Sequence, residues 1–287
     1  YADGYDAVTK ARYERQRALG LIDKSYPLPE ASHQDWNSLS AAEQDEADLK
    51  MAVYAAMIDR MDQNIGKLLA AVEASGELQN TLILFASDNG SSGEIVELEG
   101  AGEEPIGSMG GWVSLGRDWA NVSNTPYRFY KNYSHQGGIA TPLIAFWPQR
   151  IANSGSISPF PGHFIDIMPT LIDITGADYP SVNAQGENVA KPEGQSLLPL
   201  LAGENLTVRE TPLFWQWENA GAVRLGDWKL VSERIKHSDR RAKWELYNME
   251  TDKTETKDLV ERHPDLARAL QALHQQWFDR VTAWRQE

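Results

Sequence analysis

Two side chains that carry oxygen donors, Asp88 and Asn89, follow almost directly after the apolar run of residues 81–86, and Gly90 comes next. A carboxylate beside an amide carbonyl supplies the hard oxygen ligands that Ca²⁺ and Mg²⁺ prefer, and a glycine permits a sharp backbone turn. An ordinary turn explains the same residues, because Asp, Asn and Gly are the commonest turn formers. On these three residues alone the turn is favoured, and the cation site stays open as the alternative.

Lys131 and His135 form a second candidate group, just before Gly137, Gly138 and another apolar run, residues 142–147. A lysine and a histidine near a divalent cation could hold the oxygens of a tetrahedral anion and protonate or stabilise a leaving alkoxide. Sulfuryl and phosphoryl transfer both require this. Taken alone, the segment is more typical of a basic surface loop with a solvated lysine and a histidine bonded to backbone.

A long helix is predicted before the first apolar run. Ser40 and Glu43 form a capping-box signature at its start, and Gly76 ends it. Its apolar residues recur at spacings of three and four, so we expect one core-facing stripe. The stripe consists of Leu49, Val53, Ala56, Met57, Met61, Ile65, Leu68, Leu69 and Val72.

Residues 81–86 and 142–147 are predicted to be strands covered on both faces, because neither run shows polar alternation. This is typical of the parallel sheet of an α/β fold. Ligand sites in such sheets lie at the carboxyl ends of the strands, so Asp88 and Asn89 are expected at the functional edge. Residues 87–124 contain eight glycines and little periodicity, and we interpret them as an active-site loop.

The remaining elements divide the chain near residue 205. One helix is predicted over residues 6–19 and another over 164–175, where His163 and Asp166 are interpreted as capping residues rather than a metal pair. Beyond residue 205, short aromatic-rich runs predict a small antiparallel sheet, with a helix after it. The runs are 214–217, 222–225, 228–231 and 244–247, and the helix is 264–285. We therefore expect two domains, residues 1–205 and residues 206–287.

The composition excludes several classes of function. The chain has 41 acidic and 27 basic residues, for a formal net charge of -14, which disfavours nonspecific binding to nucleic acid or to an anionic membrane. Without cysteine, disulfides, thiolate metal sites and cysteine nucleophiles are excluded within this chain. The sequence shows no apolar run long enough for membrane insertion. It begins with Tyr1 and shows no export-signal pattern, so we expect a trimmed chain or part of a longer one.

Taken together, several segments resemble the type I sulfatases, which belong to the alkaline-phosphatase-like superfamily. They are spread over nearly the whole chain in the family's order: GYDAVTKARYERQRALG, SDNG, YKNYSHQGGIATPLIAFWP, HFIDIMPTLIDITGA, GQSLLPLLAG, VRLGDWKLV and WELYNMETDKTETKDL. The resemblance implies an α/β fold that contains part of a mixed, mostly parallel sheet flanked by helices. A small antiparallel sheet with a packed helix would follow it as a carboxy-terminal α+β subdomain.

The resemblance also implies roles for individual residues. In the family, the Asp and Asn of the SDNG segment bind a divalent cation, usually Ca²⁺, which carries over to Asp88 and Asn89, with Mg²⁺ as the other possible ion. The lysine before the Gly-Gly turn contacts the sulfate ester, which carries over to Lys131. His135 matches a position that is His in some relatives and Thr in others, which implies a role toward the substrate or leaving group. Gln136 stands where many relatives have Glu.

The family's nucleophile has no counterpart in these residues. Sulfatases carry, in an amino-terminal portion, a Cys or Ser in the pattern C/S-x-P-S-R that is converted to formylglycine. This sequence has no cysteine, and its two Ser-x-Pro occurrences, SYPLP and SISPF, lack the following Ser-Arg. A hydrated formylglycine attacks sulfur with the help of the metal, which is covalent, metal-assisted catalysis. We therefore expect this chain to be the carboxy-terminal part of the enzyme, inactive alone, with the amino-terminal part as its partner.

The resemblance predicts a sulfuric ester hydrolase of the arylsulfatase type, acting on a small sulfate ester or a sulfated glycan. We expect a periplasmic or extracellular location and no nucleic-acid partner. One alternative is a phosphoester or phosphonate hydrolase of the same superfamily, where a similar metal and lysine would serve phosphoryl transfer. The other alternative is a noncatalytic binding or structural remnant.

Overall fold

The computed structural model describes residues 1–96, 104–233 and 242–283. The described chain forms two compact units that are interleaved along the sequence. The first contains residues 1–68, 86–142 and 214–287, and the second contains residues 69–85 and 143–213. The predicted division into residues 1–205 and 206–287 remains a prediction. Within the described residues, no helix combines the length and apolarity needed to cross a membrane.

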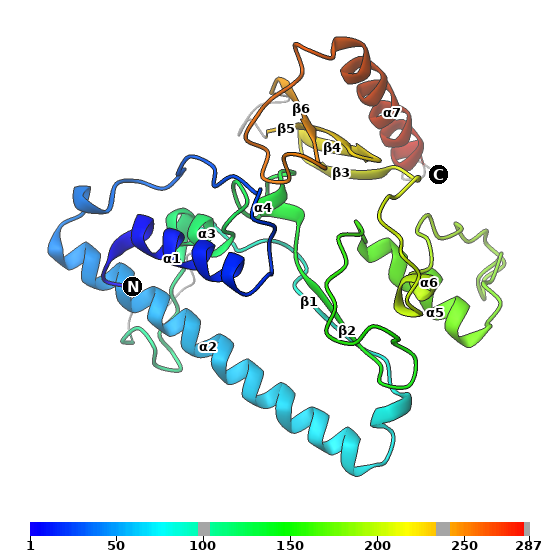
Figure 1. Ribbon diagram of the computed structural model, residues 1–287, viewed down its shortest axis with the longest axis horizontal. Helices are drawn as coiled ribbons and strands as arrows, with labels where there is room; N and C mark the ends of the chain where they lie inside the picture. Colours follow the sequence, from blue (N-terminus) through cyan, green and yellow to red (C-terminus); the bar gives the residue numbers. More distant parts are fainter. Residues whose placement is uncertain (97–103, 234–241, 284–287) are drawn as a thin grey trace. The chain divides into compact units, whose positions relative to one another are not determined.

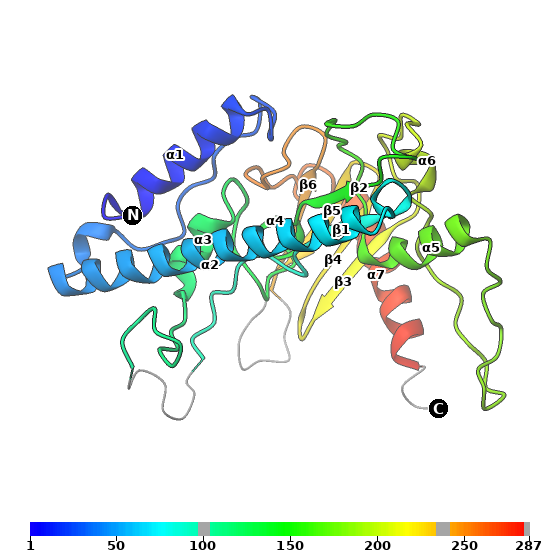
Figure 2. The same ribbon diagram turned by 90° about the horizontal axis from the view of Figure 1, so that it is seen from below.

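The amino-terminal part of the first unit is helical (Figures 1 and 2). Helix α1 (Gly4–Ala18) packs against α3 (Gly116–Ser123), and a short 3-10 turn, η1 (Trp36–Ser38), lies against α1. Their core combines aromatic and aliphatic side chains: the buried residues are Tyr5, Met51, Trp119 and Val122. The indole nitrogen of Trp119 also donates to the carbonyl of Ala47 at 2.9 Å. Helix α3 lies inside the predicted loop of residues 87–124, so that prediction missed an eight-residue amphipathic helix.

Helix α2 (Ala41–Ala74) begins where the sequence predicts it. The backbone nitrogen of Ser40 donates to the Glu43 carboxylate at 2.8 Å, and the Glu43 nitrogen donates back to the Ser40 hydroxyl at 3.4 Å, which completes the capping box. The predicted core-facing stripe is wrong for this chain, because Met51 is the one buried residue of this fully described helix. The side chains of Met57 and Leu68 are 66% and 64% exposed. The periodicity is real, but no described element covers that face.

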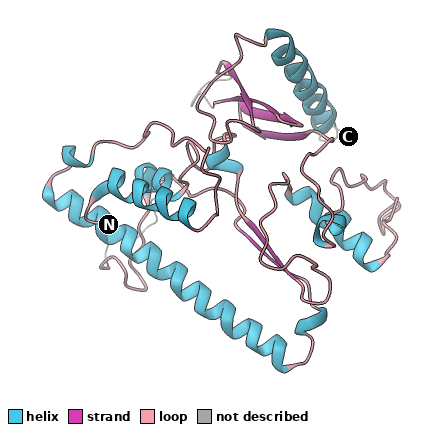
Figure 3. Ribbon diagram, viewed as in Figure 1, coloured by secondary structure: helices cyan, strands magenta, loops and turns pink. Residues whose placement is uncertain are grey.

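The carboxy-terminal part of the first unit is an antiparallel sheet with a helix, as predicted (Figure 3). The strand order is β3-β4-β5-β6. The strands are β3 (Leu213–Trp217), β4 (Ala220–Leu225), β5 (Trp228–Ser232) and β6 (Trp244–Asn248). Helix α7 (Pro264–Ala283) packs against β4 and β5. Together they enclose the core formed by Val223, Leu230, Leu246, Ala267 and Leu270.

The second unit contains a two-stranded sheet of β1 (Ile83–Ala86), whose last residue belongs to the first unit, and β2 (Leu143–Phe146). Its helical segments are η2 (Leu78–Asn80), η3 (Phe164–Asp166), α5 (Ile167–Thr175) and α6 (Leu198–Leu201). The strands form where predicted, but the prediction that both faces are covered is wrong for this chain. Phe85 is 40% exposed and Ile144 is 59% exposed. The apolar runs indicate strands, but they do not show which elements cover the faces of those strands.

The predicted capping role of His163 and Asp166 is confirmed. The backbone nitrogen of His163 donates to the Asp166 carboxylate at 2.8 Å, and the backbone nitrogen of Ile165 donates to Nδ1 of the His163 ring at 3.2 Å. Asp166 is fully buried and also takes two hydrogen bonds from the buried guanidinium of Arg209, at 2.5 and 2.8 Å. This bidentate pair links η3 to the segment before β3, and no local sequence pattern indicates it.

Candidate functional site

Backbone hydrogen bonds join the two candidate segments. The nitrogen of Gly90 donates to the carbonyl of Gly138 at 2.9 Å, and the nitrogen of Lys131 donates to the carbonyl of Ser91 at 3.0 Å. A Cβ on Gly90 would clash with the carbonyl oxygen of Gly137, so the approach requires glycine. The turn of Asp88 and the loop of Lys131 are therefore neighbours in space.

Asn124 strengthens this junction, and the sequence analysis did not single it out. Its side-chain oxygen accepts from the nitrogen of Ser91 at 2.9 Å, and its side-chain nitrogen donates to the carbonyl of Phe129 at 3.0 Å. One amide thus satisfies a backbone donor of one segment and a backbone acceptor of the other. The only signal in the sequence was its place directly before the Lys131 block.

Asp88 and Asn89 lie in the turn after β1. Asp88 is exposed, and its carboxylate makes no hydrogen bond to any residue that the structure describes. The side-chain nitrogen of Asn89 donates to the carbonyl of Gly90 at 2.8 Å, which leaves its side-chain oxygen available as an acceptor. A carboxylate and an amide oxygen that are free in this way suit a hard cation. Within the described ranges, no group of three His, Asp or Glu side chains forms a metal cluster, so these two side chains would supply only part of a ligand set.

Lys131 forms an ion pair with Glu94, another residue that the sequence analysis missed. Its ammonium lies 2.7 Å from one carboxylate oxygen of Glu94, and the side-chain nitrogen of Asn132 donates to the other oxygen at 3.0 Å. The hydrogen bonds from Lys131 and Asn132 lower the pKa of the Glu94 carboxyl to about 2. The two side chains of the ion pair are 36% and 40% exposed. Lys131 is therefore accessible and already holds an anionic oxygen.

His135 has no exposed surface. Its Nε2 lies 3.0 Å from a carboxylate oxygen of Glu245 on β6. Because a carboxylate only accepts, Nε2 carries the proton in this contact. Nδ1 has no hydrogen-bond partner among the described residues. In this conformation the imidazole does not reach the surface.

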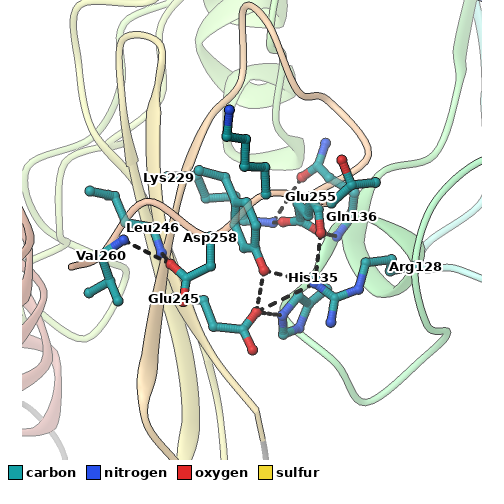
Figure 4. Close-up of polar contacts among 12 residues, drawn as sticks. Arg128, His135, Gln136, Lys229, Glu245, Leu246, Glu255, Asp258 and Val260 are labelled. Carbon is teal, nitrogen blue, oxygen red and sulfur yellow. Dashed lines mark hydrogen bonds and ion pairs between the residues drawn. The ribbon is translucent and has the colours of Figure 1, made fainter. Parts of the chain in front are cut away.

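Glu245 belongs to a chain of polar contacts that runs from β6 to Arg128 (Figure 4). The hydroxyl of Tyr247 donates to the same Glu245 oxygen at 2.5 Å and accepts from the Arg128 guanidinium at 2.8 Å. Burial alone would raise the pKa of the Glu245 carboxyl, but the hydrogen bonds from His135 and Tyr247 outweigh it and lower this pKa to about 2. Glu245 is therefore a carboxylate throughout the neutral range.

A second polar cluster lies beside it and contains two fully buried charges, Lys229 on β5 and Glu255 (Figure 4). The ammonium of Lys229 donates to one Glu255 carboxylate oxygen at 2.6 Å and to the side-chain oxygen of Gln136 at 2.9 Å. The other Glu255 oxygen accepts from the backbone nitrogen of Gln136 at 2.7 Å. Burial lowers the pKa of Lys229, and the negative charge of Glu255 opposes this shift. Neither residue stood out in the sequence.

Two family models match the chain. The sulfatase model matches residues 2–177, and the model of the N-sulphoglucosamine sulphohydrolase carboxy-terminal region matches residues 127–282. An uncharacterized sulfatase of Schizosaccharomyces pombe is 29% identical over 94% of this chain and 51% of its own length. The arylsulfatase of Klebsiella aerogenes is 36% identical over 62% of this chain and 41% of its own length. The chain thus spans about half the length of these curated relatives.

Solved structures share the fold. The crystal structure of Ps i-CgsB matches with a TM-score of 0.57 at 20% identity, covering 95% of this chain and 54% of that one. A protein solved in complex with its substrate D-glucosamine-2-N,6-O-disulfate matches with a TM-score of 0.54 at 23% identity, covering 80% of this chain and 40% of that one. The predicted α/β fold class of the alkaline-phosphatase-like type is confirmed.

Proposed function

This chain belongs to the sulfatase family, and we propose that its Asp88, Asn89 and Lys131 form part of the site at which the full-length protein hydrolyses sulfate esters. The observation that carries the proposal is the pair of backbone hydrogen bonds between the two segments, Gly90 to Gly138 and Lys131 to Ser91. These bonds bring the turn that carries the oxygen ligands of Asp88 and Asn89 next to the loop that carries the accessible ammonium of Lys131. A sulfate ester needs both kinds of group around its oxygens.

Lys131 supplies positive charge to the sulfate oxygens in this proposal. Its ammonium already holds a carboxylate oxygen of Glu94, and a contact of the same kind to a sulfate oxygen supports the proposal. Asp88 and Asn89 would hold Ca²⁺, or Mg²⁺, through their side-chain oxygens. When bound, such a cation polarises the ester oxygens and makes the nucleophile more acidic. The role of His135 toward the substrate or leaving group remains a prediction, and with no exposed surface it would require the loop to open.

The nucleophile is proposed to be a formylglycine outside these 287 residues, because the sequence contains no C/S-x-P-S-R segment. This chain is then inactive alone and needs the amino-terminal part of the enzyme. Exposed apolar faces in each unit support that partner. In the first unit, an open hollow along α2 is lined mostly by apolar side chains, among them Val53, Met57, Met61 and Leu68, together with Arg60 and Asn64. In the second unit, β2 and α5 expose Ile144 and Met168 by more than half of their surface.

We propose a sulfated small molecule or a sulfated glycan as the substrate. The matching relatives and family models include an arylsulfatase and an N-sulphoglucosamine sulphohydrolase, one named for aryl esters and the other for a sugar. A periplasmic or extracellular location is proposed from the family resemblance. The formal net charge of -14 disfavours nonspecific binding to nucleic acid, so the proposal includes no nucleic-acid partner.

An activity assay tests the proposal directly. The purified chain is incubated with a chromogenic aryl sulfate, with and without Ca²⁺, and then again after addition of the amino-terminal part. We expect no turnover from the chain alone and Ca²⁺-dependent turnover from the combination. Parallel assays with aryl phosphate and phosphonate esters address the rival chemistry. Faster hydrolysis of these esters would contradict a sulfatase, and inactivity of the combination on every ester would indicate a noncatalytic chain.

A further inference from the structure

Residues of the carboxy-terminal sheet and of the segment after it bind the loop that carries Lys131. We propose that a polar network of Arg128, Glu245, Tyr247, Lys229 and Glu255 holds the loop of residues 128–138, whose last three residues begin helix α4 (Gln136–Ile139), in the shape that presents Lys131. Tyr247, Lys229 and Glu255 are buried, and Arg128 and Glu245 are half-buried. Glu245 and Glu255 would then be positioning residues for the sulfate-binding lysine. The inference rests on the proposed function in one respect, which is the role of Lys131.

The loop adopts a backbone shape that it does not favour by itself. Phe129, two residues before Lys131, and Asn132, directly after it, have φ angles of 64° and 79°. Asn tolerates this left-handed region, but it is unfavourable for a bulky residue such as Phe. Such conformations persist where the surrounding structure enforces them. An external scaffold is therefore needed for the loop.

The loop also closes tightly on itself. The nitrogen of Gly137 donates to the carbonyl of Arg128 at 2.9 Å, so the two ends of the loop are joined. A Cβ on Gly137 would clash with this carbonyl, and one on Gly138 would clash with the carbonyl of Tyr133. The shape therefore tolerates little displacement of the backbone, and a shift at either end would move Lys131.

Glu255 binds both ends of this loop. Its backbone carbonyl accepts from the Arg128 guanidinium at 2.7 Å, and its carboxylate accepts from the Gln136 nitrogen at 2.7 Å. Lys229 completes the arrangement by donating to the Glu255 carboxylate and to the side chain of Gln136. Glu255, Lys229 and His135 have no exposed surface, so bulk water does not compete for these bonds.

Glu245 supplies a third anchor near the end of the loop. It accepts from Nε2 of His135 at 3.0 Å and from the Tyr247 hydroxyl at 2.5 Å. The ring of His135 packs edge-on against Phe129, whose left-handed backbone lies at the other end. The arginine and lysine charges of the network match its two carboxylates. The network is thus balanced in charge and leaves the ammonium of Lys131 to Glu94 or to a substrate.

Tyr247→Phe tests the proposal with little risk to folding, because the ring stays in its buried cluster with Ala222, Val231 and Met249. The variant loses the hydroxyl that bridges Glu245 and Arg128. In the full-length enzyme, we expect kcat/KM for an aryl sulfate to fall about 10- to 100-fold through displacement of Lys131. Amide exchange at Lys131, Gly137 and Gly138 should accelerate by about tenfold. Tyr5→Phe is the matched control, since Tyr5 is equally buried in the α1 cluster, and it should change neither quantity.

A rescue experiment separates the cost of an uncompensated buried charge from the contact that Glu255 makes with the Gln136 nitrogen. Glu255→Gln leaves the buried ammonium of Lys229 without a counter-charge, although it can still donate to the side chain of Gln136, and should lower kcat/KM strongly. Adding Lys229→Met removes that charge, and the amide oxygen introduced by Glu255→Gln can still accept from the Gln136 nitrogen. The double variant should therefore recover most of the activity and the slow exchange of the loop amides. A double variant no better than the single one would contradict the assigned role of Glu255.

The two readouts distinguish failure of the positioning role from failure of the proposed function. Unchanged exchange of the loop amides in Tyr247→Phe would overturn the inference, whatever the activity. Faster exchange with unchanged kcat/KM would also overturn it, because the loop would then not position a group that matters. If the wild-type enzyme hydrolyses no sulfate ester but the loop still loosens, the proposed function falls and the anchoring of the loop stands.

Discussion

The ammonium of Lys131 lies 2.7 Å from a carboxylate oxygen of Glu94, and both side chains are more than one third exposed. The Glu94 carboxylate thus pairs with the same ammonium that we propose as the binding group for a sulfate ester. Any anionic substrate must therefore displace Glu94 or share the lysine with it. Exposed ion pairs are weak, at roughly 0.2–1 kcal/mol, so the exchange is feasible.

Glu94→Gln should strengthen substrate binding. The variant removes a competing negative charge next to Lys131, and KM for an aryl sulfate should fall by about two- to fivefold, which corresponds to the strength of an exposed ion pair. Steady-state kinetics of the full-length enzyme at low ionic strength would measure this. The exposed Glu73→Gln on α2 is the control and should leave KM unchanged. A higher KM in Glu94→Gln would mean that Glu94 helps Lys131 instead of competing with substrate.

Lys131→Met should reduce kcat/KM by about 10²–10³-fold, as expected when one charged donor is removed from a transition state. Because the side chain is 36% exposed, the free energy of unfolding should change by less than about 1 kcal/mol. Kinetics and urea unfolding on the same preparation provide both quantities. Lys67→Met on the exposed surface of α2 is a matched control for the loss of charge. A drop of only a few fold would remove Lys131 from the sulfate site.

Asp88→Asn should weaken the response to Ca²⁺. Replacing a carboxylate with an amide removes the negative charge from the proposed ligand pair, so the Ca²⁺ concentration for half-maximal activity should rise by about tenfold or more. Chelation of Ca²⁺ should abolish wild-type activity, and titration with Ca²⁺ should restore it. Asp62→Asn, on α2, controls for the change in net charge. An unchanged Ca²⁺ titration would place the cation elsewhere.

The free energy of unfolding should depend on the ionisation of Glu245 at acidic pH. Its pKa in the folded protein is about 2, below the ordinary value of 4.5. A lowered pKa stabilises the fold fully above pH 4.5, and this contribution is lost as the pH falls from 4.5 toward 2. Glu245→Gln should therefore cost on the order of 2 kcal/mol at about pH 7, and less at about pH 3. Urea unfolding across this pH range would test this against the exposed Glu261→Gln, which should follow the wild-type curve.

The buried pair of Asp166 and Arg209 should dominate the stability of the second unit. Asp166→Asn leaves the guanidinium buried without its carboxylate, and the unfolding free energy should fall by about 3–5 kcal/mol. Arg209→Met combined with Asp166→Asn should recover part of this loss, because no buried charge remains. Denaturant unfolding of the single and double variants provides the comparison. Equal destabilisation of both would show that the capping bond to His163 matters more than the ion pair.

Local sequence patterns predict the short-range structure of this chain. The capping box at Ser40 and the capping pair of His163 and Asp166 formed as predicted, because their partners are three residues apart and need no tertiary contact. The short strands and the late helix also appeared where their patterns placed them. The SDNG and Lys131 segments were identified through a family resemblance, because each segment alone favoured an ordinary turn or a surface loop.

Long-range packing determines which groups meet and which side chains are buried. Glu255 binds the nitrogen of Gln136 from 119 positions away, and Glu245 reaches His135 from 110 positions away, so no local pattern could reveal either contact. Periodicity showed which residues of α2 share a face but not whether anything covers that face. Burial depends on the elements that pack against a segment. The loop of Lys131 is therefore defined by residues whose importance becomes visible only when the chain is folded.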